Sequence, residues 1–165
     1  MKVTNTKIGA MMKLTNDIYA GCAPNGKECY TYLVDQLKVK HIINMRDGEI
    51  YYSNEHTKNH SLDYPDDAST WNESKLIKWL LTKAKSIASL KGRIYIHNST
   101  GRDEEVMLAF VVWALRDPKT CPENVQEWLQ KNHYHLAIDN EERRRITVAT
   151  IKLAKKPTLD RFFKK

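Results

Sequence analysis

Apolar residues along the chain follow a strand-like pattern in some segments and a helix-like pattern in others. Short apolar runs predict buried strands at 18–21, 41–45, 60–64 and 93–96. Apolar residues at helical spacing predict helices at about 30–37, 70–87, 106–115, 125–129 and 140–154. Because strands and helices alternate, the pattern predicts a mainly parallel sheet covered by helices, which is an α/β fold.

Three residues mark the two ends of the predicted helix at 70–87. Thr70 and Glu73 have the spacing of a capping box, which satisfies backbone N–H groups at a helix start. Gly92 ends the connection from this helix to the next strand. The segment is therefore predicted as a capped helix followed by a short link.

The size and composition of the chain favour one globular domain. A length of 165 residues, with 41% hydrophobic and 28% charged residues, is typical of a single soluble domain. The sequence has no apolar run of about 18 residues and no secretory signal after Met1. We therefore expect no membrane span and an intracellular location, nuclear or cytoplasmic.

The three cysteines, Cys22, Cys29 and Cys121, lack the number and spacing of a disulfide framework or a zinc site. We expect them to be reduced and structural. A redox or metal role for Cys22 and Cys29 is the alternative. No metal ion or other cofactor is predicted.

The formal net charge of +7 is concentrated near the C-terminus. Residues 141–165 contain nine Lys and Arg against three Asp and Glu. Arg143, Arg144 and Arg145 lead this basic segment, which is expected to attract nucleic acid or an acidic protein surface. The alternative is a solvated helix face followed by a basic tail.

The most specific chemistry lies between the predicted strand at 93–96 and the helix at 106–115. The segment resembles the signature His-Cys-x-x-Gly-x-x-Arg of the cysteine-dependent tyrosine and dual-specificity phosphatases. In that family a loop of backbone N–H groups at a helix start binds phosphate, the cysteine is the nucleophile, and the arginine holds the phosphoryl oxygens. The matching residues here are His97, Asn98, Ser99, Thr100, Gly101, Arg102, Asp103, Glu104 and Glu105.

Three positions depart from this signature. Asn98 stands at the cysteine position, Glu104 at the arginine position and Glu105 at the neighbouring hydroxyl position. A carboxamide cannot act as the thiolate does, and a carboxylate about 4 Å from a phosphate repels it by about 1 kcal/mol per charge pair even in water. The resemblance therefore implies a catalytically inactive phosphatase, a pseudophosphatase.

Other positions keep parts of the family pattern. His97 matches the signature histidine and is expected to be a satisfied core side chain, with its polar atoms hydrogen-bonded. Gly101 permits the tight turn of the loop, and Arg102 keeps a basic residue that some relatives use on polyanionic substrates. The resemblance places a vestigial general acid at Asp66 or Asp67, and capping of the loop or the following helix is the alternative role.

An altered enzyme is the rival prediction. Ser99 or Thr100 would then act as the nucleophile, or Asp103, Glu104 and Glu105 would bind a divalent cation. Hydroxyl nucleophiles need a positioned base, and acidic residues at a helix start are already explained by the helix dipole. The second prediction is thus an active phosphohydrolase for protein or nucleic-acid phosphate, with displaced catalytic residues.

The segment 155–165 carries a second motif. It resembles the PIP box, Gln-x-x-aliphatic-x-x-aromatic-aromatic, the peptide that docks on the sliding clamp PCNA. Leu159, Phe162 and Phe163 match, and Lys156 replaces the glutamine. Burial of each phenylalanine in a partner would contribute roughly 1.5 to 3 kcal/mol. The alternative is that both fold back on the domain as a hydrophobic latch.

The resemblance covers roughly residues 14–155 and predicts a dual-specificity-phosphatase-like domain at 1–154, followed by a basic tail at 155–165. It implies a central four- or five-stranded, mostly parallel sheet flanked by helices. The predicted function is a pseudophosphatase that binds or scaffolds a protein partner. PCNA, and with it DNA replication, is the candidate partner through the tail.

Overall fold

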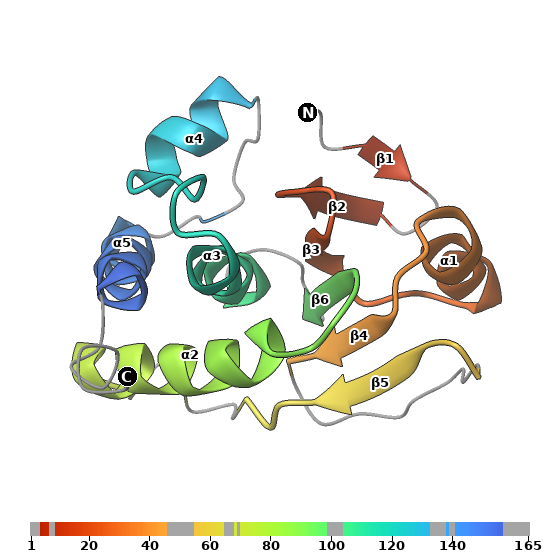
Figure 1. Cartoon of the computed structure of the whole chain (residues 1–165), viewed down its shortest axis with the longest axis horizontal. Helices are drawn as coiled ribbons and strands as arrows, with labels where there is room; N and C mark the ends of the chain where they lie inside the picture. Colours follow the sequence, from red (N-terminus) through yellow and green to blue (C-terminus); the bar gives the residue numbers. More distant parts are fainter. Residues whose placement is uncertain are drawn as a thin grey trace, which may run out of the picture.

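A six-stranded mixed sheet forms the centre of the described part of the chain (Figure 1). The computed structural model describes residues 4–6, 9–45, 55–64, 68, 70–98, 104–132, 138 and 141–156. The strands lie in the order β1-β2-β3-β6-β4-β5. Strand β2 is antiparallel to both of its neighbours, β1 and β3, whereas β3, β6, β4 and β5 are parallel to one another. Their bounds are β1 Thr4–Thr6, β2 Gly9–Lys13, β3 Ile18–Cys22, β4 His41–Asn44, β5 Lys58–Ser61 and β6 Ile94–Asn98.

Helices cover both faces of the sheet (Figure 1). On one face, α1 (Lys27–Thr31) continues directly into the π-helix η1 (Tyr32–Gln36). The other four helices lie on the opposite side. They are α2 (Glu73–Ala88), α3 (Glu104–Arg116), α4 (Val125–Lys131) and α5 (Glu141–Lys155). None of the described helices is long and apolar enough to cross a membrane.

The central strand β6 separates two hydrophobic cores. Ile94 and Ile96 belong to the core shared with α2, α3 and α5, whereas Tyr95 belongs to the smaller core beneath α1. This alternation is what a strand covered on both faces requires. Helix α3 is apolar on all sides, and every residue from Glu105 to Ala114 is buried. The two elements on either side of the predicted loop therefore lie deep inside the domain.

The predicted fold class is confirmed. The four apolar runs correspond to the parallel strands β3, β4, β5 and β6, and helices are present at all five expected places. In the described residues, the sheet extends beyond the expected four or five strands because β1 and β2 add to the β3 edge. Strand β5 lies slightly before the predicted run at 60–64, and as the edge strand it has a polar sequence, Lys-Asn-His-Ser.

The predicted capping box at the start of α2 is wrong. The helix begins at Glu73, and the N-cap is Asn72, whose side chain accepts a 2.8 Å hydrogen bond from the backbone N–H of Lys75. Asn72 is the better placed cap because its extended backbone leads directly into the first turn, whereas Thr70 lies further from it. Gly92 ends the following connection as predicted, with a φ of +106° that disfavours any side chain.

Candidate functional site

The carboxyl end of β6 lies between the carboxyl ends of two parallel strands. Asn98, the last residue of β6, is paired in register with Cys22 of β3, and His97 is paired with Asn44 of β4. Helix α3 begins beyond the loop that follows β6. Open α/β sheets bind ligands at this kind of edge, where strands end and a helix begins.

The two replaced signature positions are hydrogen-bonded to each other. Asn98 is buried, with 2% of its surface exposed, and its Nδ2 donates a 3.0 Å hydrogen bond to Oε2 of Glu104. In an active relative these positions would hold the nucleophile and the phosphate-binding arginine. Here they join the end of β6 directly to the start of α3.

Glu105 is fully buried in the first turn of α3. Its carboxylate lies near Tyr95, and burial, the nearby thiol of Cys22 and the Glu105 carboxylate together raise the pKa of Tyr95 well above its usual value. The Tyr95 hydroxyl stays protonated and donates a 2.5 Å hydrogen bond to the backbone carbonyl of Cys22. An acidic side chain and a protonated tyrosine are therefore buried next to each other below the start of α3.

His97 is buried in the core, as predicted, but within the described part of the chain the prediction that its hydrogen-bonding atoms are all satisfied is wrong. It is 8% exposed, and its ring stacks on Tyr95 with ring centroids 6.0 Å apart. Burial lowers the pKa of His97 to about 4, so the imidazole is neutral near pH 7. Its Nδ1 atom is buried and has no hydrogen-bond partner among the described residues.

Several predicted site residues lie outside the described residues, so their roles stay predictions. Two groups belong to loops: the signature positions Ser99, Thr100, Gly101, Arg102 and Asp103, and the general-acid candidates Asp66 and Asp67. The third group belongs to the tail: Leu159, Phe162 and Phe163. Lys156 is described and exposed directly after α5.

The three consecutive arginines of α5 all contact other parts of the domain. Arg143 Nη1 lies 3.4 Å from the hydroxyl of Tyr64. Arg144 Nη1 donates a 2.7 Å hydrogen bond to the carbonyl of Ile138. Arg145 forms an ion pair of 2.8 Å with Glu73 at the start of α2. These contacts hold the three guanidinium groups against the domain, and the charge of Arg145 is paired with that of Glu73.

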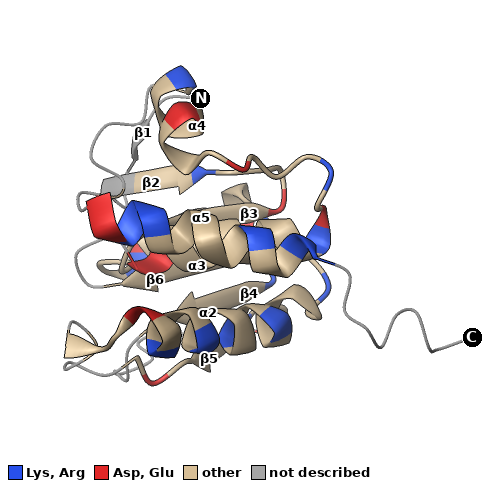
Figure 2. Cartoon of the chain, turned by 90° about the vertical axis from the view of Figure 1, so that its left-hand side faces the viewer, with Lys and Arg blue, Asp and Glu red and all other residues tan. Residues whose placement is uncertain are grey.

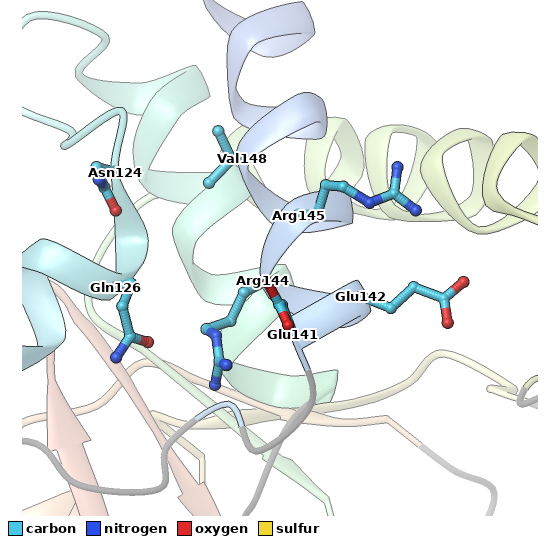
Figure 3. A pocket seen from close by; sticks show the side chains of 7 residues that line it. All are labelled: Asn124, Gln126, Glu141, Glu142, Arg144, Arg145 and Val148. Atoms are coloured by element: carbon cyan, nitrogen blue, oxygen red, sulfur yellow. The ribbon is translucent and has the colours of Figure 1, made fainter.

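A pocket of about 500 Å³ lies between α4 and α5 (Figure 3). No sequence pattern predicts this pocket, because it forms only where two helix starts meet. It carries charges of both signs, and Arg144 and Arg145 are engaged as described above. None of its lining comes from β6 or α3. The lining residues are Asn124, Gln126, Glu141, Glu142, Arg144, Arg145 and Val148.

Two further clusters bear on function. All three cysteines are free thiols, and burial raises the pKa of Cys121 to about 12, which makes it unreactive.

Two histidines on neighbouring strands are in contact. His41 Nδ1 lies 3.0 Å from His60 Nε2, and this contact depends on the β4–β5 register, so no sequence pattern predicts it. Within the described residues, no group of three or more His, Cys, Asp or Glu side chains could hold a metal ion.

Comparisons with known proteins agree with this geometry at the level of the fold. No protein-family model matches the sequence, and no curated protein sequence matches it either. Solved structures do match. PTPMT1 has a TM-score of 0.59 at 14% identity, over 87% of this chain and 95% of its own. The Yvh1 phosphatase domain from Chaetomium thermophilum has a TM-score of 0.55 at 16% identity, over 85% of this chain and 94% of its own.

A viral protein is similar to the same extent. OH1 from the Orf virus, described as a tyrosine phosphatase, has a TM-score of 0.55 at 15% identity, over 87% of this chain and 85% of its own. These similarities cover nearly the whole length of each protein. The chain therefore has the fold of the dual-specificity and tyrosine phosphatases.

Proposed function

We propose that this protein is a catalytically inactive relative of the dual-specificity phosphatases that acts by binding a protein partner. The hydrogen bond between Asn98 and Glu104 is the observation that supports this proposal most directly. It connects the two positions at which the family signature places its nucleophile and its phosphate ligand. Each side chain is a hydrogen-bond partner of the other, and neither is suited to phosphoryl transfer.

The chemistry of these positions argues against turnover. Phosphatases with this signature form a covalent bond between a thiolate and phosphorus, and the Asn98 amide nitrogen has no lone pair available for such an attack. At an effective dielectric constant of about 20, one carboxylate about 4 Å from one phosphate charge costs about 4 kcal/mol. Glu104 and Glu105 therefore oppose phosphate binding.

Acidic side chains stand at the start of α3. A helix N-terminus carries partial positive charge, and in an active relative the bound phosphate meets it. In this protein Glu104 and Glu105 occupy the first turn of α3, and Glu105 is fully buried. The protein therefore places its own acidic side chains where the family binds an anion.

An aryl phosphate assay tests the loss of activity. We expect no turnover by the unmodified protein, and the double variant Asn98→Cys/Glu104→Arg tests whether the scaffold still supports the reaction. Thermal unfolding of both proteins verifies that the variant folds. Turnover by the unmodified protein above that of a heat-denatured sample would contradict the proposal.

A residual phosphohydrolase is the rival, and one observation favours it. Cys22 of β3 is the register partner of Asn98, so a thiol lies one strand away from the position that the nucleophile would occupy. The matched variants are Cys22→Ser and Cys121→Ser, because Cys121 is buried elsewhere. If the unmodified protein is active, loss of activity in Cys22→Ser or Asp66→Asn alone would identify the displaced groups.

The tail is proposed to recruit the protein to PCNA in the nucleus. Its three apolar anchors would enter a clamp pocket, and its lysines would face an acidic surface. Titration of PCNA should show binding by the intact protein and at least tenfold weaker binding by Phe162→Ala/Phe163→Ala. The control Thr158→Ala/Arg161→Ala changes two tail positions outside the anchors. Equal binding by all three proteins would remove the clamp from the proposal.

A further inference from the structure

Helices α2 and α5 carry most of the excess positive charge of the described chain. Helix α2 contains four lysines and one glutamate, and α5 contains five basic and two acidic residues. The two helices pack against each other and are joined by the ion pair between Arg145 and Glu73. In Figure 2, Lys and Arg recur along both ribbons on the side that faces the viewer.

The exposed lysines form a row on each helix. On α2, Lys75, Lys78 and Lys85 are exposed at positions i, i+3 and i+10, which place them on one stripe. On α5 and directly after it, Lys152 and Lys156 are exposed at i and i+4. With a rise of about 1.5 Å per residue, the α2 row is about 15 Å long.

These rows lack the opposite charges that a solvated helix usually carries. Exposed helices commonly place Glu and Lys four residues apart, because each such pair stabilises the helix and like charges destabilise it. The only acidic residue of α2 is Glu73, which is paired with Arg145. Among the described residues, no carboxylate forms an ion pair with Lys78, Lys85 or Lys152. Repulsion within the rows is therefore left for a partner to relieve.

We propose that the exposed side of α2 and α5, defined by Lys75, Lys78, Lys85, Lys152 and Lys156, binds the phosphate backbone of a double-stranded nucleic acid. This surface goes beyond the proposed function and does not depend on the loop after β6. A strand of duplex DNA presents a phosphate about every 3.4 Å, so a row of about 15 Å spans about four to five of them.

The chemistry of the surface separates a duplex from other anionic partners. Protein interfaces are depleted in lysine and need buried apolar anchors, but Leu153 is the only large apolar side chain that is exposed among the described residues. Membrane-surface helices need an apolar face as well. Single strands need aromatic side chains for stacking, and Trp71 and Trp79 are half-buried against Tyr64.

Fluorescence anisotropy with a labelled duplex DNA of about 20 base pairs tests the proposal over a series of salt concentrations. The test variant is Lys75→Gln/Lys78→Gln/Lys152→Gln. The control Lys27→Gln/Lys58→Gln/Lys131→Gln removes the same charge from exposed positions on α1, β5 and α4. The basic tail is present in all three proteins, so its contribution to duplex affinity cancels when their affinities are compared.

We expect the unmodified protein and the control to bind with similar salt dependence. The test variant should bind roughly tenfold more weakly or worse, and the slope of log K against log salt should fall by about two to three. Equal weakening of test variant and control would overturn the proposal. So would tighter binding of a single strand, or binding to phosphatidylserine vesicles without binding to the duplex.

Discussion

At the scale of single residues, the substitutions in the signature loop form a matched set. Asn98, at the end of β6, is hydrogen-bonded to Glu104, at the start of α3, and the neighbouring Glu105 is fully buried. The hydrogen bond joins the two elements directly, which has consequences for stability.

A double-mutant cycle measures this contact. We expect Asn98→Ala and Glu104→Ala to be non-additive by about 1.5 to 3 kcal/mol in the free energy of unfolding, because the hydrogen bond has a charged acceptor. Chemical denaturation of the two single variants and the double variant gives the coupling energy. The control cycle combines Asn98→Ala with Glu127→Ala, an exposed residue of α4, and should be additive. A coupling near zero in both cycles would contradict the contact.

His97 makes stability depend on pH. Its folded pKa of about 4 lies below the usual value near 6.5, so the unfolded chain binds the proton more readily. Stability is therefore lost as pH falls through the usual histidine range. Between pH 7.5 and pH 5 we expect the free energy of unfolding to drop by about 2 kcal/mol from this residue alone.

Denaturation curves for the unmodified protein and for His97→Gln at both pH values test this expectation. The glutamine cannot be protonated. Between pH 7.5 and pH 5 the free energy of unfolding of the variant should therefore fall by about 2 kcal/mol less than that of the unmodified protein. His60 has a pKa lowered by burial, by His41 and by Lys58. The variant His60→Gln therefore serves as the comparison that separates the two histidines. An identical pH dependence with and without His97 would show that burial does not suppress its protonation.

The residue scale was only partly predictable from the sequence. The signature motif identifies Asn98, Glu104 and Glu105, because a family pattern fixes positions along the chain. The bond between Asn98 and Glu104 depends on how the loop closes in space. Likewise, the contact between His41 and His60 depends on the β4–β5 register, which no local pattern encodes.

At the scale of elements, polar side chains hold the helix ends to their neighbours. Arg116, at the end of α3, donates hydrogen bonds to the last carbonyl of α2 and to two carbonyls of the link between α2 and β6. Its Nη2 lies 2.6 Å from Leu90 O, its Nη1 3.3 Å from Gly92 O, and its Nε 3.4 Å from Ala88 O. One guanidinium thus ties the end of α3 to the end of α2 and to the link that follows it.

The variant Arg116→Lys should lower the free energy of unfolding by about 1 to 3 kcal/mol, because an ammonium group cannot reproduce the planar fork. Urea denaturation measures the change. The matched control is Arg145→Lys, at an exposed ion pair, for which we expect at most about 1 kcal/mol. Similar losses in the two variants would contradict a special role for Arg116.

The cap of α2 gives a second test at this scale. Asn72→Ala should destabilise the protein by about 1 kcal/mol, since the first turn loses its side-chain acceptor, whereas Asn72→Asp should keep most of the stability. Thermal unfolding distinguishes the two variants. Ser74→Ala, at the exposed position after Glu73, is the control. An unchanged melting temperature in Asn72→Ala would show that the cap contributes little.

Elements with strong periodicity were predictable, and weakly patterned ones were not. The apolar runs of β3, β4 and β6 and the helical spacing in α2, α3 and α5 gave their positions to within a few residues. Strands β1 and β2 have no such pattern, because pairing rather than local sequence makes them strands: β2 pairs with β3, and β1 pairs with β2. The cap of α2 was not predictable either, because Thr70 and Asn72 are both residue types that cap helices and they lie two positions apart.

At the scale of the whole molecule, the charged surface and the degenerate loop lie on different elements. The loop joins β6 to α3, both of which lie inside the domain, whereas the lysine rows belong to the outer sides of α2 and α5 (Figure 2). Changes in one need not disturb the other. A protein of this design can lose catalysis at the sheet edge and keep, or gain, a binding role on its outer helices.

The burial of β6 and α3 has a consequence for isotope exchange. Strand β6 is bonded to a neighbour on each side, and α3 is enclosed along its length by sheet and helices. Their amide hydrogens should exchange with deuterium only when the whole domain opens, and so more slowly than those of α4 or β5. Slow exchange on both sides of residues 99–103 would mean that β6 and α3 keep their places whatever the residues between them bind.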